Sequence, residues 1–215
     1  MAESVLGEIV ARKREDVAQR LSGKSLESLR AAARPTSRSL KSALSRPGAR
    51  FVMEVKRASP SGGTLRENAD PAALARAYRG AADAVSVLAD TPYFGGSLAD
   101  LETVRGAFDG PILAKDFVVD VRQVPEARLH GADAVLVMLS VLDDAEAAAV
   151  MAEARRLGMD ALVEAHTEAG ADLFSGKPST GSRTGARRRA DGHGAGVQAV
   201  VRNAGKSGGR VRRGI

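Results

Sequence analysis

Short apolar runs alternate with Ala-rich segments of helical spacing along the first 168 residues of the chain. The apolar runs are rich in Val, Ile and Leu, a composition typical of strands. They predict strands at 51–56, 84–89, 111–115, 133–139 and 160–164. Because these runs are apolar on both faces, we expect a parallel sheet that is covered by helices.

The segments between the predicted strands carry helix-start signals. Three of them begin with an Asp or Ser that can cap a helix: Asp70 before Pro71, Ser97 with Asp100 three residues later, and Asp143 or Asp144 before Ala-Glu-Ala-Ala-Ala. Two further helices are predicted ahead of the first strand, Val5 to Leu21 and Leu26 to Ala33. They form a helical extension over residues 1–45, in front of the sheet.

A phrase recurs where the helices lead into strands. Gly80-Ala-Ala-Asp-Ala-Val-Ser-Val-Leu88 resembles Gly131-Ala-Asp-Ala-Val-Leu-Val-Met-Leu139, and Gly158-Met-Asp-Ala-Leu-Val163 is a weaker copy. The repeat predicts βα modules of roughly 25 residues. Repeated βα modules are typical of a doubly wound sheet or of a (βα)8 barrel, and the repeat fits both.

Charged residues stand at the ends of the odd-numbered predicted strands. Glu54 and Lys56 end the first strand, where residues two apart point to the same side. Lys115 ends the third strand and Glu164 ends the fifth. The carboxyl ends of parallel strands meet at one edge, so two amines and two carboxylates are predicted to converge there. Such groups shift one another's pKa values, as acid/base chemistry requires.

Other candidates are weaker. The turn Ser59-Pro-Ser-Gly-Gly63 is either a flexible connection or, beside Lys56, a phosphate-binding loop. Phe94 and Phe117 follow the second and third strands, where they either pack over the rim or line a pocket for an aromatic substrate. The three histidines, His130, His166 and His193, receive no role.

Composition separates the body from the C-terminal part. Residues 170–215 hold ten Lys and Arg against two Asp, whereas the whole chain has a net charge of +6, so the body is close to neutral. The absence of cysteine excludes disulfides and thiolate metal sites, and three scattered histidines do not suggest zinc. No apolar run reaches the roughly 20 residues of a membrane helix, and no leader pattern opens the chain. We therefore expect a soluble, cytoplasmic protein without a membrane partner.

Four motifs in order resemble the indole-3-glycerol-phosphate synthase family of tryptophan biosynthesis. They are Glu54-Val-Lys-Arg-Ala-Ser-Pro-Ser61, Ser86-Val-Leu-Ala-Asp90 with Tyr93-Phe-Gly-Gly-Ser97, Ile112-Leu-Ala-Lys-Asp-Phe117 and Leu162-Val-Glu164. The resemblance runs to about Glu168. It implies a (βα)8 barrel with an N-terminal helical extension over the active site, here as a partial barrel over residues 46–168. The implied reaction closes the indole ring of 1-(2-carboxyphenylamino)-1-deoxyribulose 5-phosphate with loss of CO2 and water, and it needs no cofactor.

The resemblance also implies roles for single residues. Lys115 would be a general acid at the substrate carbonyl, and Glu164 would move protons or stabilise a cationic intermediate. Lys56 would bind the carboxylate and phosphate side of the substrate or protonate the leaving hydroxyl, with Glu54 orienting it; which lysine is the principal acid stays open. Ser59 would contact the phosphate, while Phe94 and Phe117 would flank the anthranilate ring.

The C-terminal part departs from the family pattern. Residues 169–215 lack the expected Asn-ending strand, the Glu-Ser-Gly strand and the Gly-Ser phosphate loop, and are rich in Gly and Arg instead. This composition predicts a disordered basic tail. Five strands cannot close the barrel, so we expect open edges on the first and fifth strands and little or no activity from this polypeptide. The abrupt change suggests a shift of reading frame near codon 168.

Two other functions are compatible with parts of the sequence. The basic tail could bind nucleic acid, but Phe174 is its only aromatic residue, so base stacking is missing. The body could be another phosphate-binding barrel enzyme, such as a phosphoribosylanthranilate isomerase, but that would require other acids at the strand ends. A P-loop at Gly205-Lys-Ser207 is rejected, because Val200 stands where its first glycine is needed.

Overall fold

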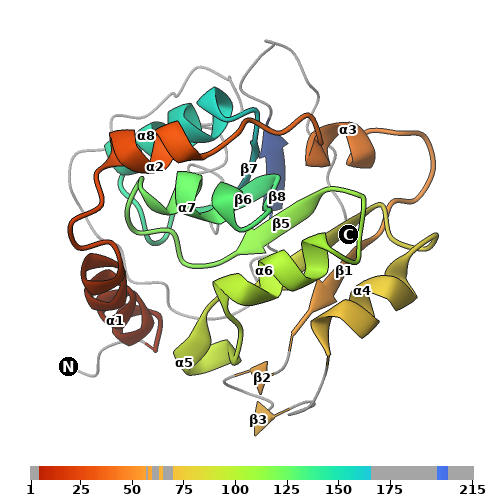
Figure 1. Cartoon of the computed structure of the whole chain (residues 1–215), viewed down its shortest axis with the longest axis horizontal. Helices are drawn as coiled ribbons and strands as arrows, with labels where there is room; N and C mark the ends of the chain where they lie inside the picture. Colours follow the sequence, from red (N-terminus) through yellow and green to blue (C-terminus); the bar gives the residue numbers. More distant parts are fainter. Residues whose placement is uncertain (1–4, 57, 60–62, 65–69, 166–197, 203–215) are drawn as a thin grey trace.

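The computed structural model describes residues 5–56, 58–59, 63–64, 70–165 and 198–202. The helices are α1 (Val5–Arg20), α2 (Leu26–Ala32), α3 (Leu40–Leu44), α4 (Pro71–Tyr78), α5 (Thr91–Phe94), α6 (Leu98–Arg105), α7 (Gln123–Leu129) and α8 (Asp144–Arg156). The strands are β1 (Val52–Val55), β2 (Ala58–Ser59), β3 (Gly63–Thr64), β4 (Ala84–Leu88), β5 (Ile112–Lys115), β6 (Ala134–Met138), β7 (Asp160–Ala165) and β8 (Gln198–Arg202). The fold is α/β (Figure 1).

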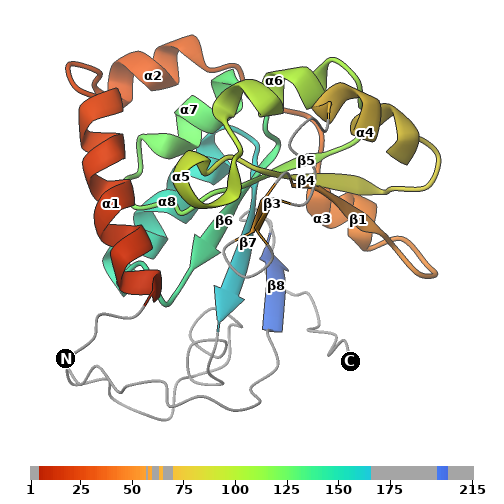
Figure 2. The same cartoon turned by 90° about the horizontal axis from the view of Figure 1, so that it is seen from below.

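The main sheet has the strand order β1-β4-β5-β6-β7-β8. The first five strands are parallel and adjacent in chain order, as the repeated βα modules predict. Helices α4, α6, α7 and α8 lie along one side of this sheet (Figure 2). The five predicted strands and the two predicted N-terminal helices are thus confirmed, with boundaries that differ by one or two residues.

Alternation along the strands separates two faces. Val85 and Val87 of β4 pack with the helices in the largest core cluster, as do Ala161 and Val163 of β7. The alternate positions point the other way, and Ala84, Leu113, Ala134 and Leu162 form a second cluster with Leu40 of α3. We call this second side the inner face of the sheet. Residues two positions apart on a strand point to the same side, so Lys115, two after Leu113, and Glu164, two after Leu162, belong to the inner face. Glu54 belongs there too, because it pairs with Ser86, two residues after Ala84.

The Asp of the repeated phrase fastens the N-terminal extension to the starts of the strands. Asp133 is fully buried and accepts hydrogen bonds from Thr36, Arg105, Arg128 and the backbone of Ile112. In the two other copies, Asp160 accepts from Ser39 and from the Lys41 backbone, and Asp83 binds Arg46 and Arg50 in the segment that joins the extension to β1. The repeat therefore marks a shared anchoring position as well as a βα module.

Two short helices were not expected from the sequence. Helix α3 covers five residues capped by Ser39, and α5 covers four residues capped by Asp90. Both are too short for the periodicity of an α-helix to be recognisable. The three N-caps that the sequence predicts are confirmed at Asp70, Ser97 and Asp143. Asp143 also forms a capping box with Glu146.

Strand β8 is the one described segment of the C-terminal part. It pairs antiparallel with β7, so the expectation of an open edge on the fifth strand was wrong. The first strand, β1, is at the edge of the described sheet. The tail that was predicted to be disordered, and that could bind nucleic acid, covers residues 169–215. Apart from β8, these residues lie outside the described part of the structure, so both predictions stay predictions.

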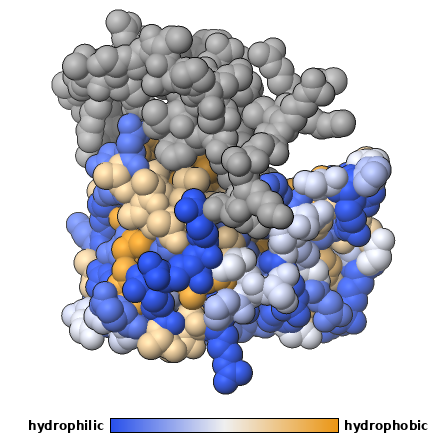
Figure 3. Space-filling model, turned by 90° about the horizontal axis from the view of Figure 1, so that it is seen from above, coloured by the Kyte–Doolittle hydropathy of each residue, from blue (hydrophilic) through white to orange (hydrophobic). Residues whose placement is uncertain are grey.

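One face of the molecule shows a group of apolar side chains bordered by hydrophilic ones (Figure 3).

Candidate functional site

Three of the predicted strand-end charges form one cluster. The Glu54 carboxylate, on β1, lies between two ammonium groups. Its Oε2 accepts a hydrogen bond of 2.5 Å from Lys115 Nζ, and its Oε1 lies 3.0 Å from Lys56 Nζ. Lys115 ends β5, two strands away across β4. The parallel sheet thus brings together residues 61 positions apart in sequence.

The cluster keeps Glu54 ionised. Partial burial disfavours its charge, but the hydrogen bonds and charges of Lys115 and Lys56 outweigh this and hold the pKa of Glu54 below its ordinary value. The side chains of Lys115 and Lys56 are 40% and 33% exposed, so both amines can be reached from solvent. A carboxylate held by two reachable lysines is an arrangement that an incoming anion can compete for.

Glu164 lies on the same face, farther along the sheet. It stands on β7 opposite Met138 of β6, and its backbone carbonyl accepts from Leu139 N at 3.0 Å. Parity with Leu162 places Glu164 on the inner face, two strands from Lys115. The four charged residues therefore share one face, and the direct ion pairs described above join Glu54, Lys56 and Lys115.

The two aromatic residues lie next to each other above the strand ends. The ring centroids of Phe94 and Phe117 are 6.1 Å apart, with planes tilted by 38°. Phe94 ends α5, where Gly95 follows in the left-handed conformation at φ 64°. A Cβ on Gly96 would lie 2.0 Å from the Leu88 carbonyl oxygen, so only glycine lets this loop pack onto β4. Both rings are half-buried and accessible.

Ser59 is the remaining predicted site residue. Its backbone belongs to β2, which pairs antiparallel with β3 beyond the end of β1. Its side chain lies outside the described part of the structure, so its contact with phosphate stays a prediction.

A buried ion triad next to this cluster was missed in the sequence. Lys13 Nζ, from α1, lies 3.0 Å from Asp90 Oδ1 and 2.5 Å from Asp116 Oδ1. The three side chains are 4%, 3% and 9% exposed. Burial favours the neutral amine, but the two carboxylates outweigh it and raise the pKa of Lys13. A signal existed: Lys13 occupies the i+4 position between Ile9 and Val17, in the apolar stripe of α1.

Ser86 was also missed. It pairs with Glu54 in the sheet, it is 5% exposed, and its hydroxyl has no hydrogen-bond partner among the described residues. A serine within an apolar strand gives no signal of its own, since its surroundings depend on the neighbouring strands.

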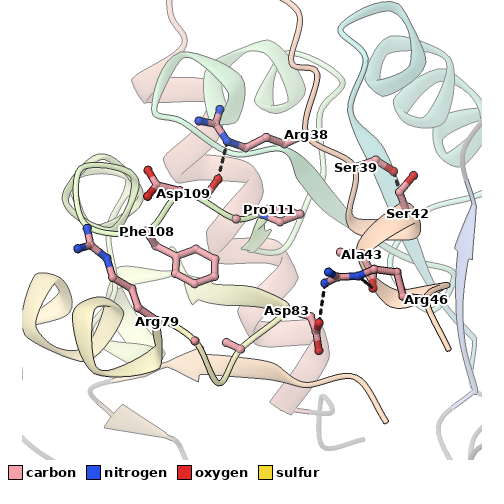
Figure 4. A pocket seen from close by; sticks show the side chains of 13 residues that line it. Arg38, Ser39, Ser42, Ala43, Arg46, Arg79, Asp83, Phe108, Asp109 and Pro111 are labelled. Carbon is pink, nitrogen blue, oxygen red and sulfur yellow. Dashed lines mark hydrogen bonds and ion pairs between the residues drawn. The ribbon is translucent and has the colours of Figure 1, made fainter. Parts of the chain in front are cut away.

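A pocket lies at the opposite end of the strands. It has a volume of about 640 Å³ and is lined by α3 and by the segments that lead into β4 and β5 (Figure 4). Its arginines are already bound within the protein: Arg46 pairs with Asp83, Arg38 donates to the Asp109 carbonyl, and Arg79 donates to the Ala107 carbonyl. None of the predicted strand-end charges lines this pocket, so we place the candidate site elsewhere, at the Glu54 cluster.

The described residues contain no group of three His, Cys, Asp or Glu side chains that could hold a metal ion. In the same part of the chain, no helix has the length and apolar character needed to cross a membrane.

Comparison with known proteins places the chain in a family. Residues 6–174 match the family described as indole-3-glycerol phosphate synthase. Proteins of that name are 53% identical in Micrococcus luteus over 76% of this chain, 50% identical in a Nocardioides species over 77%, and 46% identical in Mycobacterium avium over 79%. The matched regions cover 64%, 65% and 63% of these relatives. A solved structure described as a probable mandelate racemase from Alicyclobacillus acidocaldarius has a TM-score of 0.40 at 17% identity, covering 76% of this chain and 39% of its own.

The family match ends near the point where the composition changes, and the chain spans less than two thirds of the length of these relatives. The matches favour indole-3-glycerol phosphate synthase over a phosphoribosylanthranilate isomerase. By sequence, and in keeping with its parallel α/β architecture, the chain belongs to the indole-3-glycerol phosphate synthase family.

Proposed function

We propose that this chain carries the strand-end residues for indole-3-glycerol phosphate synthesis. The reaction closes the indole ring of 1-(2-carboxyphenylamino)-1-deoxyribulose 5-phosphate, with loss of CO2 and water and without a cofactor. The family folds as a (βα)8 barrel, and five adjacent parallel strands in chain order are what one part of such a barrel requires.

One observation carries the proposal: the Glu54 carboxylate bridges Lys115 and Lys56 at the carboxyl ends of β1 and β5. In parallel barrels this end of the strands holds the chemistry. The substrate has a carboxylate and a phosphate, and two reachable lysines provide the complementary charge. An anionic group that binds one lysine would take over an ion pair now made by Glu54.

Within this proposal, Lys115 acts as general acid at the substrate carbonyl. Lys56 binds the anionic side of the substrate, oriented by Glu54. Glu164, on the same inner face, moves protons or stabilises the cationic intermediate. The ring pair of Phe94 and Phe117 supports the assignment, because an anthranilate ring needs aromatic or apolar walls.

A chimera tests the proposal. Residues 1–165 of this chain would be joined to the part of the Micrococcus luteus relative that begins at the position aligned with residue 166 and runs to the end of that relative. We expect the folded chimera to form indole-3-glycerol phosphate, measured by the change in absorbance as the indole ring forms. Lys115→Met should lower kcat by about 10²- to 10⁴-fold, the usual contribution of a general acid.

Lys24→Met is the matched control, because Lys24 is an exposed lysine in the turn after α1. It should leave kcat unchanged. The 215-residue polypeptide itself should show little or no turnover, because its residues after 174 lie beyond the family match. A cooperatively folded chimera without turnover, or one that keeps full activity with Met at position 115, would contradict the proposal.

A further inference from the structure

The Lys13 triad connects three separate segments at the end of the sheet that holds the candidate site. Lys13 comes from α1, Asp90 follows β4, and Asp116 follows Lys115 at the end of β5. All three side chains are more than nine-tenths buried. A buried charge is retained only when its partners lie in hydrogen-bonding positions, so the ammonium group fixes the separation of the two carboxylates.

Each carboxylate also accepts a hydrogen bond from the backbone of a ring-bearing segment. Asp90 is the N-cap of α5, and its Oδ2 accepts from Tyr93 N at 3.3 Å, immediately before Phe94. Asp116 Oδ1 accepts from Phe117 N at 2.9 Å. A single ammonium group is therefore bonded to the two carboxylates that orient the two ring-bearing segments.

Lys13 is not needed simply to attach α1. Arg20, one residue before Leu21, makes two 2.9 Å hydrogen bonds to Glu126 of α7. Val17 and Leu21 form an apolar cluster with Leu29 and Val119. These contacts hold the helix against α7 and against Val119, two residues after Phe117, but they make no hydrogen bond to Asp90 or Asp116. Lys13 is the residue of α1 that is bonded to those two carboxylates.

We propose that Lys13 is a positioning residue that sets the spacing between the Phe94 and Phe117 rings, and thereby the shape of the aromatic surface that the two rings present to a substrate ring. The identity of that ring as an anthranilate rests on the proposed function. The dependence of the ring spacing on Lys13 does not, since it concerns the protein without ligand.

The test uses the full 215-residue chain labelled with 4-fluorophenylalanine. The chain has five Phe residues, so ¹⁹F NMR gives one resonance for each, assigned by replacing them singly with Leu. Lys13→Met should move the resonances of both Phe94 and Phe117 by more than their linewidths. Phe108, which lies in the core cluster on the helix side, should not move.

Asp90→Asn keeps the test decisive if the Met variant does not fold. Asparagine retains an N-cap acceptor, and the remaining Lys13–Asp116 pair is charge-balanced, so this variant should stay folded. It should move the Phe94 resonance and leave that of Phe117 in place. Arg20→Met is the matched control on the same helix: it weakens helix docking but leaves the hydrogen bonds of Lys13 in place, so it should move both ring resonances less than Lys13→Met does.

Two outcomes would overturn the proposal. One is that both ring resonances stay in place in folded Lys13→Met protein, or that the Phe94 resonance stays in place in folded Asp90→Asn protein. The other is that Arg20→Met moves them equally, which would make helix docking alone responsible.

Titration with anthranilate, followed by its own fluorescence, separates this inference from the proposed function. We expect Lys13→Met to weaken its binding about threefold to tenfold, the loss of one aromatic contact. If the unaltered chain binds no anthranilate while the ring resonances respond to Lys13, the proposed function is in doubt and the positioning role of Lys13 stands.

Discussion

Replacing Asp133 is expected to cause a large loss of stability. Its carboxylate is fully buried and binds two arginines that are themselves largely buried. Oδ1 accepts from Thr36 at 2.6 Å and Arg128 at 2.8 Å, and Oδ2 accepts from Arg105 at 3.0 Å and Ile112 N at 3.1 Å. Asp133→Asn retains the shape but replaces one acceptor oxygen with an amide donor.

Either orientation of the new amide faces a donor. If Nδ2 takes the place of Oδ2, it meets Arg105 and the Ile112 amide; if it takes the place of Oδ1, it meets Arg128. The arginines also lose their counter-charge. Breaking a buried ion pair by removing one partner destabilises proteins by about 3–5 kcal/mol. We expect a loss of that size in the free energy of unfolding.

Urea unfolding followed by circular dichroism measures the loss. With a slope of about 2 kcal/mol/M, the midpoint should fall by about 1.5–2.5 M. Asp120→Asn is the control, because the Asp120–Arg122 pair has a similar length of 2.8 Å but side chains that are 29% and 27% exposed. It should cost less than about 1 kcal/mol. A midpoint shift for Asp133→Asn no larger than that of the control would refute the reasoning.

Two further predictions concern the candidate site. The pKa of Glu54 lies below its ordinary value of 4.5, so its ionised form stabilises the fold above that pH, and this contribution is lost as the pH falls through the lowered pKa. The stability difference between the unaltered chain and Glu54→Gln, measured by urea unfolding from pH 7 to pH 3, should therefore shrink below about pH 4.5; a constant difference would contradict the role of the two lysines. Gly96→Ala should destabilise the chain by about 1–3 kcal/mol, because the new Cβ meets the Leu88 carbonyl at 2.0 Å. Gly106→Ala, where φ is −67° and the nearest neighbour is 3.6 Å away, is its control and should be neutral or slightly stabilising in the same unfolding assay; equal effects would refute the steric argument.

Local pattern was sufficient for most of the architecture. Runs such as Ala84–Leu88 and Ala134–Met138 are apolar on both faces, and that property depends only on the order of residues along the chain. The same holds for the caps at Asp70, Ser97 and Asp143, since a cap bonds to backbone two or three residues away. Helix α5 escaped prediction because one turn contains no repeat of the helical period.

Strand-end chemistry was predictable for a topological reason. Once the strands are parallel, their carboxyl ends share an edge, so Glu54 and Lys115 must come close although neither position alone says so. Which atoms bond is a different question: the 2.5 Å contact and the bridging of Lys115 and Lys56 by Glu54 depend on side-chain conformations set by the packed sheet.

Local periodicity and motifs were enough to predict the parallel α/β order of five strands, the N-terminal helices, the family and the edge at which the charged residues gather. Three contacts could be seen only in the folded chain: β8 pairs with β7, the Asp of the repeat anchors the N-terminal extension, and Lys13 lies between Asp90 and Asp116. These contacts join segments far apart along the chain. Their formation depends on the packing of several elements at once, and no local pattern contains that information.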